Sequence, residues 1–391
     1  MSTAERPTPP APMLQGIIPP HLLRQIAAAA EDQQASAAQR TLAVGRRVAG
    51  NREVRAARTG RPGFPGPGAG LVPPHLVQHL APPRPATAPP AAAAPVGVLR
   101  RRVHDAQQGT ALPGVLARGE GQDATGDEAV DEAYDGLGAT WELFQQVFGR
   151  DSLDDAGMEL VATVHYGQDF QNAFWDGEQM IFGDGDGVYF RSFTNAVDVI
   201  GHELAHGVVQ FTAGLIYVAQ PGALHESVAD CIGSMVKQRV LGQSAEEADW
   251  LIGEGVFTDA VRGVALRSMK APGTAYDDPV LGTDPQPASM AEYADLPHDE
   301  ENDNGGVHIN SGIPNRAFYL AATGIGGTSW DGAGPIWYEA LTASGLPKDA
   351  DFAAFAAATL EVAARRHGAG SPQLDAVEAA WRTVGVLGAD G

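Results

Sequence analysis

Two histidines and a glutamate stand together in the segment His202-Glu203-Leu204-Ala205-His206. On a helix, residues four apart share a face, so the rings of His202 and His206 would lie one turn apart on one side. That spacing suits two corners of a zinc tetrahedron, and a catalytic zinc takes three protein ligands and keeps one position open. Glu203 would lie beside such a metal, where a carboxylate can take a proton from water. The segment predicts a hydrolytic metal centre.

Glu226 is the expected third ligand, because a carboxylate from a second helix would complete a set of two histidines and one glutamate. It follows His206 after 19 intervening residues. Asp230 comes four residues after Glu226 and would share its helix face. A carboxylate in that place can accept the other ring N–H of a ligand histidine and so fix its tautomer.

Both segments have the apolar spacing of helices. The pattern runs from Asn195 through Phe211 with no proline before Pro221, and it resumes over residues 223–241. Pro221-Gly222 is expected to separate the two helices. The alternative is a pair of surface helices with ordinary histidines and acids. The helical context and the placement of the two acids favour the metal centre.

Further motifs make the chain resemble the thermolysin family of zinc endopeptidases from about Leu112 to the C-terminus. The metal motif is accompanied by five matching stretches, at residues 172–175, 179–180, 183–187, 265–269 and 303–312. The resemblance implies one catalytic zinc held by His202, His206 and Glu226, with Glu203 as the general base. It also implies peptide or protein substrates.

The same resemblance implies three more groups of side chains around the zinc. Those that stabilise the oxyanion are His308 and Tyr217, with Asp303 orienting His308. Those that hold the substrate backbone are Asn172, Ala173 and Arg267. Those that line the pocket for the residue after the scissile bond are Phe190, Phe193, Val199 and Leu266. Because that pocket is apolar, cleavage is expected on the amino side of bulky apolar residues. Amide hydrolysis independently needs a nucleophile, oxyanion donors and a proton for the leaving amine, which these groups can provide.

Calcium is a possible second metal, because the family often carries it near the active site. Asp198, Asp249 and Glu254 match family calcium ligands, but Lys237 stands where a bridging glutamate is expected and Leu251 where another acid is. An ammonium group cannot ligate calcium and repels it. The sequence therefore predicts at most one calcium ion here. Residues 184–187 begin like an EF-hand loop but lack its later acids, so we interpret them as a turn.

The N-terminal quarter of the chain holds a near-repeat. Residues 16–27, which begin Gly-Ile-Ile-Pro-Pro-His-Leu, match residues 70–81, which begin Gly-Leu-Val-Pro-Pro-His-Leu. Each copy predicts a short helix with proline in its first turn. The motif resembles the short inhibitory prosegment of the protealysin-like branch of the family, except that the family pattern has one copy. Which copy docks is left open, and so is the alternative that the repeat has no inhibitory role.

These patterns divide the chain into four parts. We expect a short prosegment over residues 1–59 and a Gly/Pro/Ala-rich linker with the second copy over 60–97. A sheet-rich half with the zinc helix then covers 98–212, and a helical half covers 213–391. The fold class is α+β, with the active-site cleft between the halves. Helices are predicted at 127–148, 337–346, 351–367 and 372–386, and strands at 160–165 and 179–182.

Charge and composition narrow the possible partners. Residues 1–97 hold ten arginines and four acids, or +6, so the remainder carries −22 − 6 = −28. An acidic body argues against nucleic acid as a partner, and no apolar run is long enough for a membrane helix.

Because Cys231 is the only cysteine, an internal disulfide is excluded. With no recognisable signal peptide, we expect a monomeric bacterial protein that is cytoplasmic or secreted by a non-classical route. The rival functional hypothesis is a pseudoenzyme, or a permanently latent protease that acts through partners.

Overall fold

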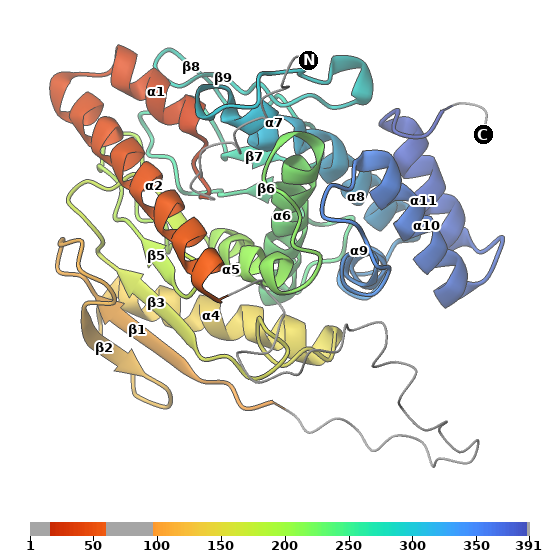
Figure 1. The fold of residues 1–391 in the computed structure, drawn as a ribbon, viewed down its shortest axis with the longest axis horizontal. Coiled ribbons are helices and arrows are strands. Elements are labelled where there is room, and N and C mark those ends of the chain that lie inside the picture. Colours follow the sequence, from red (N-terminus) through yellow and green to blue (C-terminus); the bar gives the residue numbers. More distant parts are fainter. Residues whose placement is uncertain (1–15, 60–96, 389–391) are drawn as a thin grey trace, which may run out of the picture.

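The chain, described here from a computed structural model, is defined over residues 16–59 and 97–388 (Figure 1). The side chains of residues 46–59 lie outside this description. So does the predicted linker with the second copy of the repeat, apart from Gly97.

A mixed five-stranded sheet forms the first half of the body. Its strand order is β2-β1-β3-β5-β4. The strands are β1 (Arg101–Asp105), β2 (Val115–Gly119), β3 (Leu160–Val164), β4 (Ala173–Trp175) and β5 (Met180–Phe182). β1, β3 and β5 are parallel, while β2 and β4 pair antiparallel at the two edges. The chain crosses from the β1–β2 hairpin to β3 through α4 (Glu128–Val147).

Helix α4 forms where the sequence predicts it and covers the sheet. Its N-cap is Asp127, whose side chain accepts a hydrogen bond from the backbone N–H of Val130. Tyr134, Leu137, Trp141 and Phe144 are buried at helical spacing on one face, so the apolar stripe of the sequence is the packed face of the helix.

The second half of the body is helical. Its helices are α5 (Val197–Phe211), α6 (Ala219–Leu241), α7 (Asp303–Asn310), α8 (Gly312–Ile325), α9 (Ala333–Thr342), α10 (Phe352–His367) and α11 (Pro372–Thr383). Short elements join them: the strand pairs β6 (Leu251–Ile252) with β7 (Arg267–Ser268) and β8 (Asp277–Asp278) with β9 (Gly282–Thr283), and the 3-10 turns η1 (Met290–Glu292) and η2 (Glu300–Asn302). The α+β fold class is confirmed.

Helix α6 begins earlier than the sequence pattern suggested. It starts at Ala219, so Pro221 lies in its first turn and does not end a linker. A proline is tolerated there because the first N–H groups of a helix have no intrahelical partner. Helix α9 likewise begins at Ala333, four residues before the predicted start. Among the described residues, no helix is long and apolar enough to cross a membrane.

Two N-terminal helices, which precede the body in the sequence, lie against it. They are α1 (Pro20–Ala29) and α2 (Asp32–Thr59), coloured red to orange in Figure 1. Proline occupies the first turn of α1, as predicted for this copy of the repeat. Just before α1, Gly16 pairs antiparallel with Phe174 of the edge strand β4. The first copy of the repeat therefore extends the sheet at the edge beside the predicted cleft.

Candidate metal centre and active-site cleft

Two glycines let α5 and α6 pack at close range. A Cβ atom on Gly233 would lie 2.3 Å from the backbone oxygen of Asp198, and one on Gly201 would lie 3.1 Å from the Cα of Gly233. A side chain at position 233 would collide with the backbone of α5, and one at position 201 would require a small shift of α6. This close packing of α5 and α6, visible in Figure 1, brings His202 and His206 of one helix beside Glu226 of the other.

The three predicted zinc ligands converge in a buried cluster. The Nε2 of His202 lies 3.4 Å from one carboxylate oxygen of Glu226, and the Nε2 of His206 lies 3.7 Å from the other. Among the described residues, the Nε2 of His202 and the Oε2 of Glu226 have no hydrogen-bond partner although both atoms are buried. A buried polar atom without a partner is costly, and a cation would satisfy both. Two imidazoles and a carboxylate are the donors of a catalytic zinc site, so the residues fit this metal.

Asp230 is placed as the sequence predicted, and it does more than orient one ligand. Its Oδ1 lies 2.7 Å from the Nδ1 of His202 and 2.8 Å from the Nη2 of Arg267. Its Oδ2 accepts from the Nε of Arg267 at 2.9 Å and from the side-chain amide of Asn315 at 2.7 Å. Burial opposes ionisation, but Arg267 and His202 outweigh it and lower the pKa of Asp230 to about 2. The carboxylate therefore stays charged at neutral pH.

Asn315 is a site residue that the sequence analysis missed. It is fully buried on α8 and donates to a carboxylate 85 residues away in sequence. Its one sequence signal is its position shortly after the 303–312 motif, which does not indicate where its side chain is directed.

Glu203 is fully buried beside the metal cluster. Its Oε2 accepts a hydrogen bond from the backbone N–H of Trp175 at 3.0 Å and lies 3.9 Å from the Nε2 of His206. Burial raises the pKa of Glu203 to about 8. A dication beside it would favour the charged form and counter that shift. The edge strand β4 therefore holds the carboxylate beside the metal cluster.

A left-handed turn positions His308. Asp303, Asn304, Gly305 and Gly306 all have positive φ, between 50° and 82°. This is the region that glycine adopts without steric cost. The turn folds Asp303 back so that its carboxylate accepts from the backbone N–H of His308 at 2.7 Å and lies 2.6 Å from its Nδ1. The ring orientation and the start of the following helical turn are thus fixed by one side chain.

Tyr217 completes this side of the cleft. Its hydroxyl donates to the Oε1 of Glu226 and lies 3.2 Å from the Nε2 of His308. Burial and the nearby charge of Glu226 raise the pKa of Tyr217 well above its usual value, so the phenol keeps its proton. The tyrosine and the histidine present two polar atoms on the same side of the cluster.

The first copy of the repeat occupies the cleft through its main chain. The backbone N–H of Ile17 donates to the carbonyl of Ala173 at 3.2 Å, and the Ile17 carbonyl accepts from Arg267 at 3.1 Å. Ile18 exchanges two bonds with the side-chain amide of Asn172, at 3.0 and 3.3 Å. The three residues expected to hold a substrate backbone therefore hold residues 17–18 of this chain.

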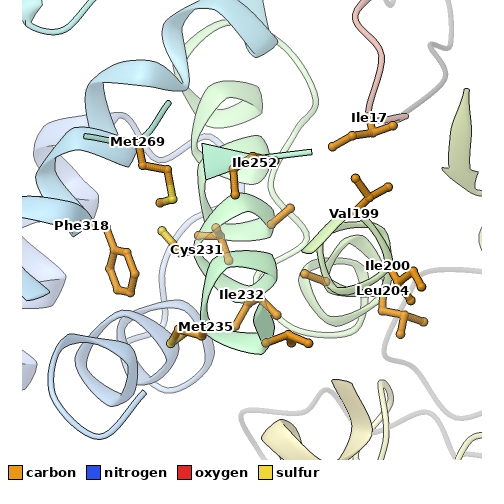
Figure 2. Close-up of a cluster of buried hydrophobic side chains, with 14 of the residues drawn as sticks. Ile17, Val199, Ile200, Leu204, Cys231, Ile232, Met235, Ile252, Met269 and Phe318 are labelled. Carbon is orange, nitrogen blue, oxygen red and sulfur yellow. The ribbon is translucent and has the colours of Figure 1, made fainter. Parts of the chain in front are cut away.

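The residues expected to line the apolar pocket are all buried, and Ile17 lies beside one of them, Val199 (Figure 2). Ile17 has no solvent exposure and shares one buried hydrophobic cluster with Val199 (Figure 2). Phe190, Phe193 and Leu266 belong to the same cluster, and the two phenylalanine rings lie 5.8 Å apart. Gly16, on the other side of the Ile17 N–H, has its carbonyl 3.1 Å from the Nε2 of His308. The Gly16–Ile17 peptide bond therefore lies between the oxyanion side chains and the apolar pocket.

Lys237 meets the three carboxylates of the possible calcium site. Its Nζ lies 2.8 Å from Asp249, 3.0 Å from Glu254 and 4.0 Å from Asp198. Although burial works against its charge, the carboxylates, Asp198 foremost, raise the pKa of Lys237. Burial raises the pKa of Asp198 to about 6. The ammonium group thus lies at the centre of the acidic cluster.

Residues 184–187 form a turn, as the sequence predicted. The Oδ1 of Asp186 accepts hydrogen bonds from the backbone N–H groups of Val188, Tyr189 and Phe190.

Comparison with known proteins agrees with the fold. Residues 101–210 match the model of the thermolysin metallopeptidase catalytic domain, and residues 213–386 match that of its alpha-helical domain. The fold and the cluster of two histidines and a glutamate define a zinc metalloendopeptidase. The chain belongs to the thermolysin family of metallopeptidases, in its protealysin-like branch.

Two relatives that match over nearly their whole length support that branch. An extracellular metalloprotease of Pectobacterium carotovorum is 49% identical over 95% of this chain and 96% of its own length. The precursor of protealysin, a metalloproteinase from Serratia proteamaculans, has a solved structure that matches with a TM-score of 0.79 and 46% identity, over 95% of this chain and all of that one. Thermolysin of Alicyclobacillus acidocaldarius is 37% identical over 72% of this chain and 50% of its own length.

These relatives correct the expected location. Proteins of Pectobacterium carotovorum and Serratia marcescens that are 49% identical to this chain over the matched regions are named extracellular metalloproteases. The expectation of a cytoplasmic or non-classically exported protein is therefore wrong, and the relatives point to secretion. That expectation rested on the lack of a recognisable signal peptide. The lack of such a pattern does not show which route a protein takes.

The geometry makes a first prediction about Glu203. Glu203→Gln should retain one zinc per chain but lose at least ~10³-fold of casein-hydrolysing activity, because the ligands remain and the proton acceptor is lost. Metal analysis and a casein assay on the same sample measure both quantities. Glu361→Gln, an exposed substitution on α10, is the matched control. Near-normal cleavage by Glu203→Gln would contradict the assignment.

Proposed function

We propose that this zinc endopeptidase is made as a precursor whose first repeat blocks its own cleft, and that the mature enzyme cuts on the amino side of bulky apolar residues. The observation that carries the proposal is the placement of residues 16–18. Their main chain is bound by Asn172, Ala173 and Arg267, and the fully buried side chain of Ile17 lies beside Val199 (Figure 2). The proposal assigns residues 1–59 to the prosegment.

Each side chain of the cleft has a proposed part in hydrolysis. His202, His206 and Glu226 would hold the zinc, which when bound polarises a carbonyl and makes water more acidic. Glu203 takes a proton from water and passes it to the leaving nitrogen. His308, oriented by Asp303, and Tyr217 donate hydrogen bonds to the oxygen on which negative charge develops. Asn172, Ala173 and Arg267 fix the substrate backbone, so the reacting bond is aligned before reaction.

The docking contacts explain both latency and specificity. A substrate that follows the same path would place its side chain after the scissile bond where Ile17 lies. Burying an aliphatic or aromatic side chain there contributes roughly 1.5–3 kcal/mol, whereas an unpaired charge would have to be desolvated. The N-terminal arm, which comprises residues 1–97, thus binds through the same apolar preference that we propose for substrates.

Specificity is the second prediction. After removal of the arm, a peptide library should be cut mainly before Leu, Phe, Ile or Val, because Phe190, Phe193, Val199 and Leu266 offer apolar surface alone. Mass-spectrometric sequencing of the products measures the preference. A profile dominated by lysine, arginine or acidic residues at that position would refute the assignment of the pocket.

Latency is the third prediction. The full-length chain should be weakly active, and a form lacking residues 1–97 should be more active, because Asn172 and Arg267 would then be open to substrate. The arm carries +6 and the body −28, so rising salt should weaken docking and raise the activity of the full-length form. Casein assays of both forms across salt concentrations test this, with circular dichroism to confirm folding. A folded truncated form that is no more active than full length would disprove inhibition by the arm.

The fourth prediction concerns calcium at Asp198, Asp249 and Glu254. Lys237 supplies the counter-charge that these carboxylates need, so we propose that the wild type binds at most one calcium ion there. Its melting temperature should depend little on calcium. Lys237→Glu should restore binding and gain about 2.7 kcal/mol when calcium is at 100 times its Kd. Lys237→Met, which removes the charge but adds no ligand, should lose stability and gain no calcium response. Two tightly bound ions in the wild type, detected by calorimetry, would show that this argument fails.

A further inference from the structure

The bonds that hold the first copy in the cleft are largely independent of its side chains. At residues 16–18, the arm contributes main-chain N–H and carbonyl groups, and the catalytic body contributes the side chains of Asn172, Arg267 and His308. Any extended segment can offer those main-chain groups. One position is restrictive, because a Cβ atom on Gly16 would lie 2.8 Å from the carbonyl oxygen of Ala173.

The second copy satisfies that restriction and keeps the apolar pattern. Gly70 corresponds to Gly16, and Pro73-Pro74 to the prolines at the start of α1. The five buried apolar side chains of the first copy are Ile17, Ile18, Leu22, Leu23 and Ile26. Their counterparts are Leu71, Val72, Leu76, Val77 and Leu80, all apolar. Every buried apolar contact of the first copy therefore has a counterpart of similar character.

His21 is also matched, by His75. The ring nitrogens of His21 are buried and make no hydrogen bond to a described residue. Burial lowers the pKa of His21 to about 4, so the neutral ring is the form that docks. A histidine at this place in both copies fits a common docked position.

The second copy lacks the contacts that strengthen the first. Arg24, which donates to the carbonyls of Glu300 at 2.5 Å and Glu301 at 2.6 Å, is replaced by Gln78. The first copy is also continued by α2, whose Thr41 accepts from the backbone N–H of Gln171 at 3.1 Å. The second copy is followed by a Pro/Ala-rich stretch, which is unsuited to continue as a helix. The second copy is therefore expected to bind more weakly.

The second copy is tethered closely enough to reach the cleft. The 16 residues from Pro82 to Gly97 can span at most ~55 Å. A body of about 290 residues has a radius of gyration of roughly 19 Å. A tether of this length gives an effective concentration on the order of 1 mM, so even a Kd of about 0.1 mM would leave only about one cleft in ten open.

We propose that residues 70–81 are a second, weaker occupant of the same cleft, which binds when the first copy is absent or displaced. This inference rests on the proposed inhibition by the first copy. Cutting the chain between the copies releases the first and leaves the second attached to the body. Activation then has two stages, and full activity requires loss of both copies.

Point substitutions in the full-length chain test the proposal. Ile17→Asp disables the first copy because a charge would have to enter the apolar cluster, and Leu71→Asp is the matched change in the second. We expect Leu71→Asp to leave the activity unchanged and Ile17→Asp to raise it less than threefold. The double variant should be at least tenfold more active than Ile17→Asp. Intact-mass analysis must show that the chains remain uncut during the assay.

A second pair of variants and a synthetic peptide test the proposal even if an aspartate variant does not fold. Gly16→Val and Gly70→Val, which introduce the Cβ clash, should reproduce the series where an aspartate variant does not fold. A synthetic peptide of residues 70–81 should inhibit the double variant competitively, and the same peptide with Leu71→Asp should not. An Ile17→Asp variant as active as the double variant would overturn the proposal. If the double variant and the form lacking residues 1–97 were both inactive on casein, the proposed function itself would be wrong.

Discussion

The buried carboxylate of Asp230 connects the metal cluster to the substrate-binding side of the cleft. It bonds to His202, to Arg267 through two nitrogens, and to Asn315. A fully buried charge is tolerated only when it is paired and its lone pairs are satisfied, and here three partners from three segments do so. Removing any one of them would leave a charge or a donor unpaired inside the protein. Three segments distant in sequence are therefore held in one arrangement.

Helix packing makes that arrangement possible. Gly201 and Gly233 allow α5 and α6 to approach so closely that side chains from both can share one small volume. The cluster that results is costly without a cation, since buried polar atoms of His202 and Glu226 have no hydrogen-bond partner among the described residues. The fold thus buries polar atoms that have no hydrogen-bond partner among the described residues and that a bound cation would satisfy.

The sequence predicted local features better than distant ones. The helical pattern around His202 and the resemblance of residues 303–312 to a known motif indicated the fold class and the cluster of ligands, because both depend on spacing within one segment. The start of α6 was placed too late, because Pro221 was interpreted as a separator although a first turn accepts it. Asn315 was missed because its partner is 85 residues away, and no periodic pattern reports such a contact.

The sequence also could not decide which copy of the repeat docks, since the two have the same apolar pattern. The contacts of Arg24 and of α2 distinguish them, and these depend on surfaces that the repeat itself does not contain.

The pairing of Gly16 with Phe174 also has a consequence for colloidal behaviour. β4 is an edge strand of the five-stranded sheet, and an unpaired edge is a template on which another chain can add. In the precursor that edge is covered by the molecule's own N-terminal segment. A chain that keeps this segment is therefore protected against edge-to-edge association at β4. Without this segment, the exposed edge would be only three residues long, which limits how much another chain could pair with it.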